Sequence, residues 1–472
     1  MSDPLGARPE LQEALDLAAA EASAYLAGIA GDHVLRPGSE DAARGWPDPM
    51  PEQGDGTLAT VTELARRGRE AATRSSGPRF FHFVMGGGTP AALAADWLAS
   101  AYDNSAYTWA SSPLASAIEK VATGWLRELF ELPEEFQGVL VTGATMANFV
   151  GLAAARHRWA EALGVDVEET GLAGLPAPAI LSSGYVHPSA TQAIGMLGLG
   201  RGNVRRLTRD AVGRLDLAAL ERELGQAGEA GAIVIANAGE VNAGDFDPID
   251  EMADLAAEHG AWLHVDGAFG LFARLGRASR GLTEGIERAD SIGSDAHKWL
   301  NVPYDCGFTF VREPERLPRA LNVGAPYLPS AEDPNPNFGF MAPENSRRAR
   351  GLAVWATLRA YGREGHREMV ERHLALAQRL ASRVDDTAEL ERLADVPLNI
   401  VCFRARPPGA AEADLDQLNR ELGAALLRDG RVFAGTTTYD GKVAFRPAIV
   451  NWQTEEADVD LLVDVLLELL RA

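Results

Sequence analysis

Cysteine is scarce in this chain of 472 residues. Only Cys306 and Cys402 are present, and no Cys-x-x-Cys motif exists, which argues against a disulfide framework and against thiolate zinc or redox sites. No apolar run approaches the ~20 residues that a membrane span needs. The N-terminus lacks the basic and then apolar layout of a signal peptide. We therefore expect a cytoplasmic protein that has no membrane partner.

Positive charge is also in short supply. The sequence has 44 Lys and Arg against 67 Asp and Glu, a formal net charge of −23, which argues against nucleic acid and anionic membranes as partners. The His-Glu-x-x-His motif of metal hydrolases is absent, and we predict no metal site. The glycine string at 198–203 follows a helical segment and precedes a strand. This order is the reverse of that in a dinucleotide-binding motif and argues against a nicotinamide oxidoreductase.

The central part of the chain alternates short apolar runs with segments of helical periodicity. Such alternation is typical of a largely parallel sheet covered by helices on both faces. Helices are expected between most of the strands, for example over 146–159 and 217–224. The expected strands are 139–142, 179–182, 204–207, 232–236, 262–266, 291–293 and 307–311.

The two ends of the chain have different patterns. The first part predicts helices over 11–28 and 58–73, separated by a Pro- and Gly-rich stretch, 31–56, without regular structure. The last part predicts a loop, two long helices, three strands and a final helix, at 325–337, 346–361, 364–384, 398–404, 432–436, 443–447 and from about 457. We therefore divide the chain into a helical segment, a large domain and a small α+β domain, at 1–85, 86–315 and 316–472.

One basic cluster stands out in this acidic chain. Arg347, Arg348 and Arg350 lie at the start of the predicted helix 346–361. The cluster either attracts a substrate carboxylate or a partner subunit, or it is simply a solvated helix start. We expect the solvated helix start.

Lys298 directly follows His297 in the segment SIGSDAHKW, after an apolar strand. A single lysine is most often an ordinary surface residue. The functional interpretation is a lysine whose amine forms a Schiff base with an aldehyde cofactor.

Asp266 ends the apolar strand of GAWLHVDGAFG, at the sheet edge where ligands bind in open α/β folds. A carboxylate there can hold a pyridine nitrogen protonated, which makes the ring an electron sink. The small Ala268 would leave room beneath a flat ring. The alternative is that Asp266 only caps the next helix.

Two further segments bring polar groups to the same sheet edge. The turn of Gly143, Ala144 and Thr145 opens a helix after a strand, and its N–H groups with the Thr145 hydroxyl form a phosphate seat. His187 follows another strand and can stack on a flat ring or act as an acid or base. An ordinary turn and a structural histidine are the alternatives for each alone. Together with Lys298 and the strand-end carboxylate, they are the parts that hold pyridoxal 5′-phosphate (PLP), the predicted cofactor.

From about residue 78 onward the chain resembles the group II PLP-dependent amino-acid decarboxylases, which include the aromatic-amino-acid and glutamate decarboxylases. The motifs are DAHKW, HVDGAFG, the segments 108–133 and 346–362, and FRPAIVNWQTEEADVD. The resemblance implies an α/β fold, PLP-dependent transferase fold type I. Its large domain would have a mostly parallel seven-stranded sheet with helices on both faces, beside the small α+β domain. The resemblance also implies a homodimer with shared active sites, in which segment 1–85 packs on the partner.

The resemblance assigns roles to single residues. Lys298 would form the Schiff base, Asp266 would meet the pyridine nitrogen, and His187 would stack on the ring. With Glu240, which stands close to the cofactor, these are the predicted catalytic residues. Further cofactor contacts are expected from Ala268, Ala144, Thr145, Ser294 and His297. The substrate pocket is expected to include Phe80, His82, Trp109 and Phe338.

The implied reaction is decarboxylation of an L-amino acid to CO₂ and an amine, but two positions depart from the family pattern. The loop before the SRRAR helix offers Phe338, Phe340 and Met341, and no tyrosine to protonate the intermediate. In the family, losing that hydroxyl is associated with oxidative deamination to an aldehyde. Glu240 stands where the family usually has threonine, and it either changes the local charge or points away. Oxidative deamination remains the main alternative, followed by another carbon–carbon lyase or aminotransferase reaction.

Overall fold

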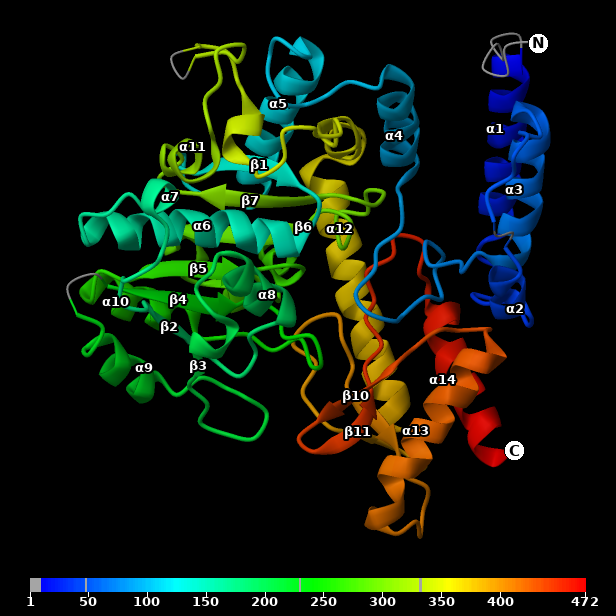
Figure 1. Ribbon diagram of the computed structural model, residues 1–472. Helices are drawn as coiled ribbons and strands as arrows, with labels where there is room; N and C mark the ends of the chain where they lie inside the picture. The colour runs from blue at the N-terminus through cyan, green and yellow to red at the C-terminus, as the bar shows by residue number, and fades with distance from the viewer. Residues whose placement is uncertain (1–9, 47–48, 229–230, 331–332) are drawn as a thin grey trace.

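The computed structural model describes residues 10–46, 49–228, 231–330 and 333–472. Figure 1 shows three parts: long N-terminal helices at one side, a large sheet covered by helices, and a smaller C-terminal domain toward the bottom of the view. Within the described ranges, no helix is long and apolar enough to cross a membrane. The same residues bring together no group of three side chains that could hold a metal ion.

The large domain is built on a seven-stranded sheet in the order β1-β7-β6-β5-β4-β2-β3. Only β7 runs antiparallel to its neighbours, so the sheet is mostly parallel, as predicted. The central strands are buried along their whole length, which explains their continuous apolar sequences. The strands are β1 (Gln137–Val141), β2 (Ala179–Ser182), β3 (Val204–Arg206), β4 (Ala232–Asn237), β5 (Trp262–Asp266), β6 (Ser291–Asp295) and β7 (Gly307–Val311).

Helices cover both faces of this sheet (Figure 1). Alternate strand residues enter two separate cores: Val141 and Ile235 pack with α6 and α8, whereas Leu140 and Val234 pack with α5, α9 and α10. This separation follows from the two-residue period of a strand. The helices of this domain are α4 (Pro90–Tyr102), α5 (Pro113–Leu129), α6 (Ala144–Ala162), α7 (Val167–Thr170), α8 (Pro188–Met196), α9 (Leu217–Leu224), α10 (Ile249–Glu258) and α11 (Arg316–Leu321).

The N-terminal segment forms α1 (Leu11–Gly28), α2 (Ser39–Arg44) and α3 (Thr57–Ala71), and α3 packs on the other two. The prediction that 31–56 lacks regular structure is wrong for α2. Arg44 pairs there with Glu40 and Asp41 one turn earlier, a spacing that supports a helix. No residue of α1 or α3 is buried, so this segment leaves apolar surface open.

The small domain has a four-stranded antiparallel sheet in the order β10-β11-β9-β8. The two predicted helices 346–361 and 364–384 are the two halves of α12, which begins at Gly351 and is divided by a kink at Gly362, where φ is 62° and the backbone is not helical. The predicted break is therefore confirmed, and only the predicted start of the first helix is too early. The sequence patterns missed β8 and α13 and placed two strands too early. The elements are α12 (Gly351–Asp385), β8 (Leu390–Arg392), β9 (Phe403–Ala405), α13 (Glu412–Asp429), β10 (Thr436–Tyr439), β11 (Lys442–Phe445) and α14 (Glu456–Arg471).

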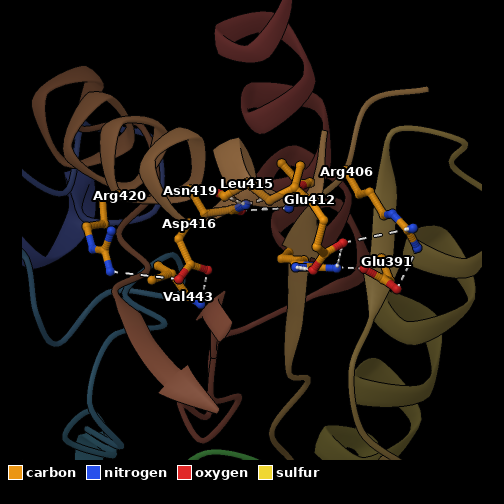
Figure 2. A network of polar contacts seen from close by, with 10 residues as sticks. Glu391, Arg406, Glu412, Leu415, Asp416, Asn419, Arg420 and Val443 are labelled. Atoms are coloured by element: carbon orange, nitrogen blue, oxygen red, sulfur yellow. Dashed lines mark hydrogen bonds and ion pairs between the residues drawn. The ribbon is translucent and has the colours of Figure 1, made fainter. Parts of the chain in front are cut away.

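Helix α13 is fixed to this sheet by buried polar side chains (Figure 2). The Asn419 amide accepts from the N–H of Ala405 at 2.7 Å and donates to its carbonyl at 2.9 Å. Beside it, buried Arg404 donates to Glu391 at 2.6 Å and to Glu412 at 2.7 Å. The Asn419 side chain of α13 thus forms the hydrogen bonds of the Ala405 backbone that a neighbouring strand would otherwise provide.

The N-terminal half also contributes to the small domain. The N–H of Phe81 donates to the carbonyl of Phe433 at 2.8 Å, and the Ala448 N–H donates to the carbonyl of Phe81 at 3.0 Å. The Thr454 hydroxyl donates to the carbonyl of Pro78 at 2.8 Å. The segment 76–84 therefore packs as part of a domain made almost 400 residues later in the chain.

The basic cluster before α12 is not a solvated helix start. Arg347 has no exposed side-chain surface and pairs with buried Glu119 at 2.8 Å. It also donates to the carbonyl of Leu140 at 2.5 Å. Arg350 is 9% exposed and pairs with Asp305 at 2.8 Å. The cluster thus fixes α12 to the large domain.

Candidate functional site

The candidate site lies where β5 and β6 end. Lys298 follows β6, and its Nζ lies 3.1 Å from Oδ2 of Asp295 and 5.8 Å from the centre of the Phe269 ring. The other oxygen of Asp295 accepts from the N–H of Ala144 at 2.5 Å, at the first residue of α6. Asp295 therefore joins the lysine amine to a helix N-terminus, whose partial positive charge suits a carboxylate. Sequence reasoning missed Asp295, although it begins the DAHK motif.

The start of α6 approaches the lysine loop closely. A Cβ on Gly143 would lie 3.1 Å from the His297 ring, and a Cβ on Gly307 would lie 2.6 Å from the Gly143 Cα. Glycine at both positions lets the helix start sit against β7 and His297. Thr145 is half-buried in this first helical turn. The predicted phosphate seat therefore lies directly beside Lys298.

Asp266 is the last residue of β5 and is 5% exposed. Its Oδ2 accepts from the Asn148 side chain at 2.8 Å, and its Oδ1 accepts from the N–H of Ala268 at 3.2 Å. The alternative role as a helix cap is wrong, because the next helical turn begins after Phe269 without a side-chain cap. Asn148 was not singled out from the sequence, since one asparagine within a helix carries no motif.

His187 immediately precedes α8, and its Nδ1 accepts from the N–H of Ser189 at 3.2 Å. Burial lowers the pKa of His187, and the charges of Asp266, Lys298 and Arg446 also act on this imidazole. The fold thus brings His187, at the start of α8, into electrostatic range of Asp266 at the end of β5 and of Lys298 after β6.

His297 is buried against the same loop. Its Nδ1 accepts from the N–H of Cys306 at 3.2 Å, and its Nε2 lies 3.4 Å from Oδ1 of Asp295. Its ring stacks on Tyr304 with centres 4.2 Å apart. Burial lowers the pKa of His297, so the neutral imidazole braces the segment that carries Lys298.

Two other predicted cofactor contacts serve the backbone in this structure. The hydroxyl of fully buried Ser294 donates to the carbonyl of Gly267 at 2.9 Å. The carbonyl of Ala268 accepts from the N–H of Asp295 at 3.0 Å. Both tie the ends of β5 and β6 together, and their contacts with the cofactor remain predictions.

Glu240 turns its carboxylate into its own loop. Its oxygens accept from the Asn242 amide at 2.5 Å and from the N–H of Ala243 at 2.8 Å. Burial raises the pKa of Glu240, while the charge of Arg446 opposes that rise. The catalytic role predicted for Glu240 remains a prediction.

Arg446 is a group that the sequence analysis did not single out. Its guanidinium donates to the carbonyl of Phe83 at 2.6 Å, and burial lowers its pKa. No described carboxylate lies within ion-pair distance of it. Its charge also acts on His82 and His187. The sequence signal for Arg446 was the FRP motif, which indicated the family but gave no role to the arginine.

The four predicted substrate-binding residues form two pairs in the chain. Phe80 stacks on Phe433 with ring centres 5.4 Å apart. His82 packs on Gly435, where a Cβ would lie 1.8 Å from its ring. Burial lowers the pKa of His82 to about 4. This first pair therefore belongs to the small domain.

The second pair lies at the edge of the large domain. The backbone N–H of Trp109 donates to the Asn337 side chain at 3.0 Å. Phe338 is 2% exposed and begins a short 3-10 helix, η6 (Phe338–Met341), that packs in the α6 core. Within one chain, Phe80 and His82 therefore contact the small domain, whereas Trp109 and Phe338 contact the edge of the large domain.

A cavity of about 350 Å³ adjoins the lysine loop. It lies between α1 and α4, and Gly86 closes one side so tightly that a Cβ there would lie 1.9 Å from the carbonyl oxygen of Lys298. Its other lining residues include Tyr25, Leu26, Trp97, Pro303 and Tyr304.

The chemistry of this donor set fits PLP. Lys298 offers a primary amine for the aldehyde, and Asp266 offers a buried carboxylate for the ring nitrogen. The start of α6 offers the Thr145 hydroxyl and the N–H groups that follow Ala144 for the phosphate, since the Ala144 N–H donates to Asp295. These three groups stand at neighbouring strand ends or on the helix start between them, the edge at which α/β sheets bind ligands.

The chain is similar to known proteins in sequence and in fold. The family model "Pyridoxal-dependent decarboxylase conserved domain" matches residues 39–406. An L-2,4-diaminobutyrate decarboxylase of Rhizobium meliloti is 33% identical over 438 residues, covering 90% of this chain and 84% of that protein. A phenylacetaldehyde synthase of Arabidopsis thaliana is 27% identical over 427 residues, covering 88% and 86%. The crystal structure of Oryza sativa TDC with PLP and tryptamine matches with a TM-score of 0.89 and 28% identity, covering 100% and 99%. The predicted fold type I is thereby confirmed.

Proposed function

The chain belongs to the pyridoxal-dependent decarboxylase family and is a PLP-dependent carboxy-lyase, and we propose that it converts an L-amino acid to CO₂ and an amine. The observation that supports this most directly is the placement of Asp266 and Lys298 at the ends of the neighbouring strands β5 and β6, with His187 linked to Asp266 through Ser189 and Asn148. An amine, a buried carboxylate and an imidazole are the groups that PLP chemistry requires of a protein.

PLP, when bound, accepts the electron pair of the bond to the leaving carboxylate. In our proposal Lys298 holds the cofactor through its amine, which Asp295 orients from 3.1 Å. Asp266 pairs with the ring nitrogen and His187 stacks on the ring. The remaining cofactor contacts are proposed for Ala268, Ala144, Thr145, Ser294 and His297.

Arg446 is proposed to receive the substrate carboxylate. It is a half-buried cation without a described acidic partner in ion-pair range, and its charge acts on His82, Glu240 and His187. The binding of an anion would offset the free-energy cost of removing the Arg446 guanidinium from water. Beside it, Phe80 forms an aromatic wall with Phe433, which favours an apolar or aromatic substrate side chain.

A second copy of the chain is proposed to complete the site. The 1–85 segment exposes Leu11, Leu15 and Leu26, and α4 exposes Trp97, an apolar surface that a homodimer would bury. The half-buried Trp109 would then reach the partner's substrate pocket, whereas Phe338 is buried in the α6 core and would support that edge from within its own subunit. We expect analytical ultracentrifugation to show a dimer at micromolar concentration. A Leu15→Glu variant should dissociate more readily, and a monomer in both samples would contradict the proposal.

Oxidative deamination is the second candidate, because the loop at 338–341 has no tyrosine to deliver a proton. The relative named a phenylacetaldehyde synthase shows that aldehyde-forming enzymes occur among similar proteins. In this reaction, the amino acid, O₂ and one water would give CO₂, ammonia, an aldehyde and hydrogen peroxide, with O₂ as the oxidant and water as the source of the aldehyde oxygen.

The test is a product assay with a pool of L-amino acids, run in air and without oxygen. One amine formed for each CO₂, both in air and without oxygen, would support the main proposal. Aldehyde and peroxide that require oxygen would support the second. In parallel, Lys298→Ala should fold normally but lack the near-visible absorbance of protein-bound PLP. Retention of that band in the variant would contradict the assignment of Lys298.

A further inference from the structure

A buried chain of hydrogen bonds leads away from Asp266 through the interior of the large domain. The indole N–H of Trp262 lies 2.9 Å from Ser291 Oγ, which lies 2.8 Å from His264 Nδ1. His264 Nε2 lies 3.0 Å from Asn148 Oδ1, and Asn148 Nδ2 lies 2.8 Å from Asp266 Oδ2. All five residues are at most 5% exposed. We call these five residues the Asp266 relay.

The donor and acceptor at each link follow from the two ends of the relay. Ionised Asp266 only accepts, so the Asn148 amide must present its NH₂ to the carboxylate and its oxygen to His264. His264 Nε2 therefore carries the proton, and its bare Nδ1 accepts from Ser291. The indole of Trp262 only donates, so Ser291 accepts from it. Every link thus donates toward Asp266.

The surrounding backbone leaves room for this relay. A Cβ on Gly151 of α6 would lie 2.8 Å from His264 Nδ1 and 2.9 Å from Ser291 Oγ. A Cβ on Gly293 of β6 would lie 2.8 Å from Asn148 Oδ1. Neither glycine has a positive φ. Glycine is needed at both positions because the relay side chains lie too close to the backbone for a Cβ.

A side branch reaches His187. The Asn148 NH₂ lies 3.5 Å from Ser189 Oγ, which lies 2.7 Å from His187 Nδ1. The Ser189 N–H also donates to that nitrogen, so His187 Nδ1 is an acceptor and Nε2 carries its proton. One asparagine therefore contacts the carboxylate and, through Ser189, the histidine that we assign to the cofactor.

We propose that Asn148 and His264 are positioning residues that hold Asp266 as an oriented anion toward the PLP ring nitrogen. The inference rests on the proposed role of Asp266. In a dry interior, aligned donors strengthen one another and stabilise the charge at the end of their chain. An anionic Asp266 in turn keeps the ring nitrogen protonated, which is the form that accepts electrons.

The test measures the ring nitrogen directly, on holoenzyme reconstituted with PLP that is ¹⁵N-labelled in the ring. In the native protein, the ¹⁵N shift should be that of a protonated ring nitrogen from pH 6 to 9. In His264→Phe, the Asn148 oxygen loses its donor. We expect the ring-nitrogen titration midpoint to fall by about one pH unit or more and PLP affinity to fall about tenfold.

His373→Phe is the matched control. His373 is also fully buried and bonded at both nitrogens, to the Trp299 indole at 2.8 Å and to the Asn451 carbonyl at 2.9 Å. The substitution removes a hydrogen bond of Trp299, the residue next to Lys298, and leaves the five residues of the Asp266 relay unchanged. The ring-nitrogen signal should stay native in this variant. An equal shift in His264→Phe and His373→Phe would overturn the proposal, because it would reflect general loosening.

Two further variants keep the test decisive if His264→Phe does not fold. Ser291→Ala removes only the hydroxyl that donates to His264 and should give a smaller shift of the same sign. Asn148→Leu has a similar volume but removes both the NH₂ that donates to Asp266 and the oxygen that accepts from His264, and it should give the largest shift of the same sign among the relay variants. A native ring-nitrogen signal in both variants would overturn the relay.

Asp266→Asn separates this inference from the proposed function. If the ring nitrogen is unaffected in Asp266→Asn, the proposed contact between Asp266 and the cofactor is wrong. If it changes in Asp266→Asn but in none of the relay variants, the proposed contact stands and the relay is wrong. Changes in Asp266→Asn and in the relay variants together support both.

Discussion

At the scale of single residues, the ion pair between Arg347 and Glu119 sets an expectation for stability. Both side chains are almost completely buried, so removing Arg347 leaves a buried, unpaired carboxylate. We expect Arg347→Met to lower the free energy of unfolding by about 3–5 kcal/mol in urea titrations. The neighbouring Arg348→Met breaks a partly exposed pair with Asp96 and should cost less than about 1 kcal/mol. Similar losses in both would contradict the burial argument.

Residues at strand ends were predictable, and residues that act through distant partners were not. Asp266 and Lys298 each end or follow an apolar run, so the strand pattern alone placed them at the ligand-binding edge. Asn148 lies inside a helix, and Arg446 comes from the small domain. Their importance depends on contacts with residues more than 100 positions away, which no local pattern reports.

At the scale of elements, the attachment of α13 to the small sheet depends on the side-chain amide of Asn419. Asn419 is fully buried and satisfies both the N–H and the carbonyl of Ala405 on β9. We expect Asn419→Leu to leave those backbone groups unpaired and to cost about 2–4 kcal/mol. Amide hydrogen exchange should become faster in α13 first. Arg420→Leu, one residue along on the exposed side, is the control and should leave exchange unchanged.

The elements that the sequence patterns found differ physically from those that they missed. The central strands of the large sheet are buried on both faces, so their apolar runs are unmistakable. β8 has three residues and only Leu390 is buried, which leaves no alternation to detect. The break within α12 was predictable from the sequence, because Gly362 takes a positive φ that other residues avoid and divides the helix there by a kink.

At the scale of the whole molecule, buried histidines should make the protein acid-sensitive. Burial lowers the pKa of His264 and His366 to about 4 and that of His373 to about 3. The unfolded chain takes up these protons near pH 6.5. Stability is therefore present above that pH and is lost as pH falls toward the folded pKa values, by about 1.4 kcal/mol per pH unit for each group.

We expect the urea midpoint to fall between pH 7 and pH 5, and to fall less in His366→Gln. Asp247 acts in the opposite direction, because burial raises its pKa to about 6. The folded state then holds the Asp247 proton to higher pH than the unfolded state, so this one group adds stability as pH falls through 6. A midpoint that does not change between pH 7 and pH 5 would contradict the expectation that the buried histidines dominate the acid sensitivity.

The small domain should not fold without residues 76–84. That segment supplies backbone hydrogen bonds to Phe433 and Ala448 and packs Phe80 on Phe433. We expect the fragment 363–472 to show no cooperative thermal transition by circular dichroism. A fusion that adds residues 76–84 should restore one, whereas a scrambled nine-residue peptide should not. A cooperative transition in the unextended fragment would be inconsistent with this dependence.

The same contact constrains synthesis on the ribosome. Pro78 and the Thr454 hydroxyl that binds it are 376 residues apart. At roughly 5–20 residues per second, the segment 76–84 waits about 20–75 s for its partners to be translated. The large sheet can assemble during that interval, but the aromatic residues of the waiting segment stay uncovered. A chain that stalls before Thr454 therefore exposes Phe80 and Phe81 to chaperones and proteases.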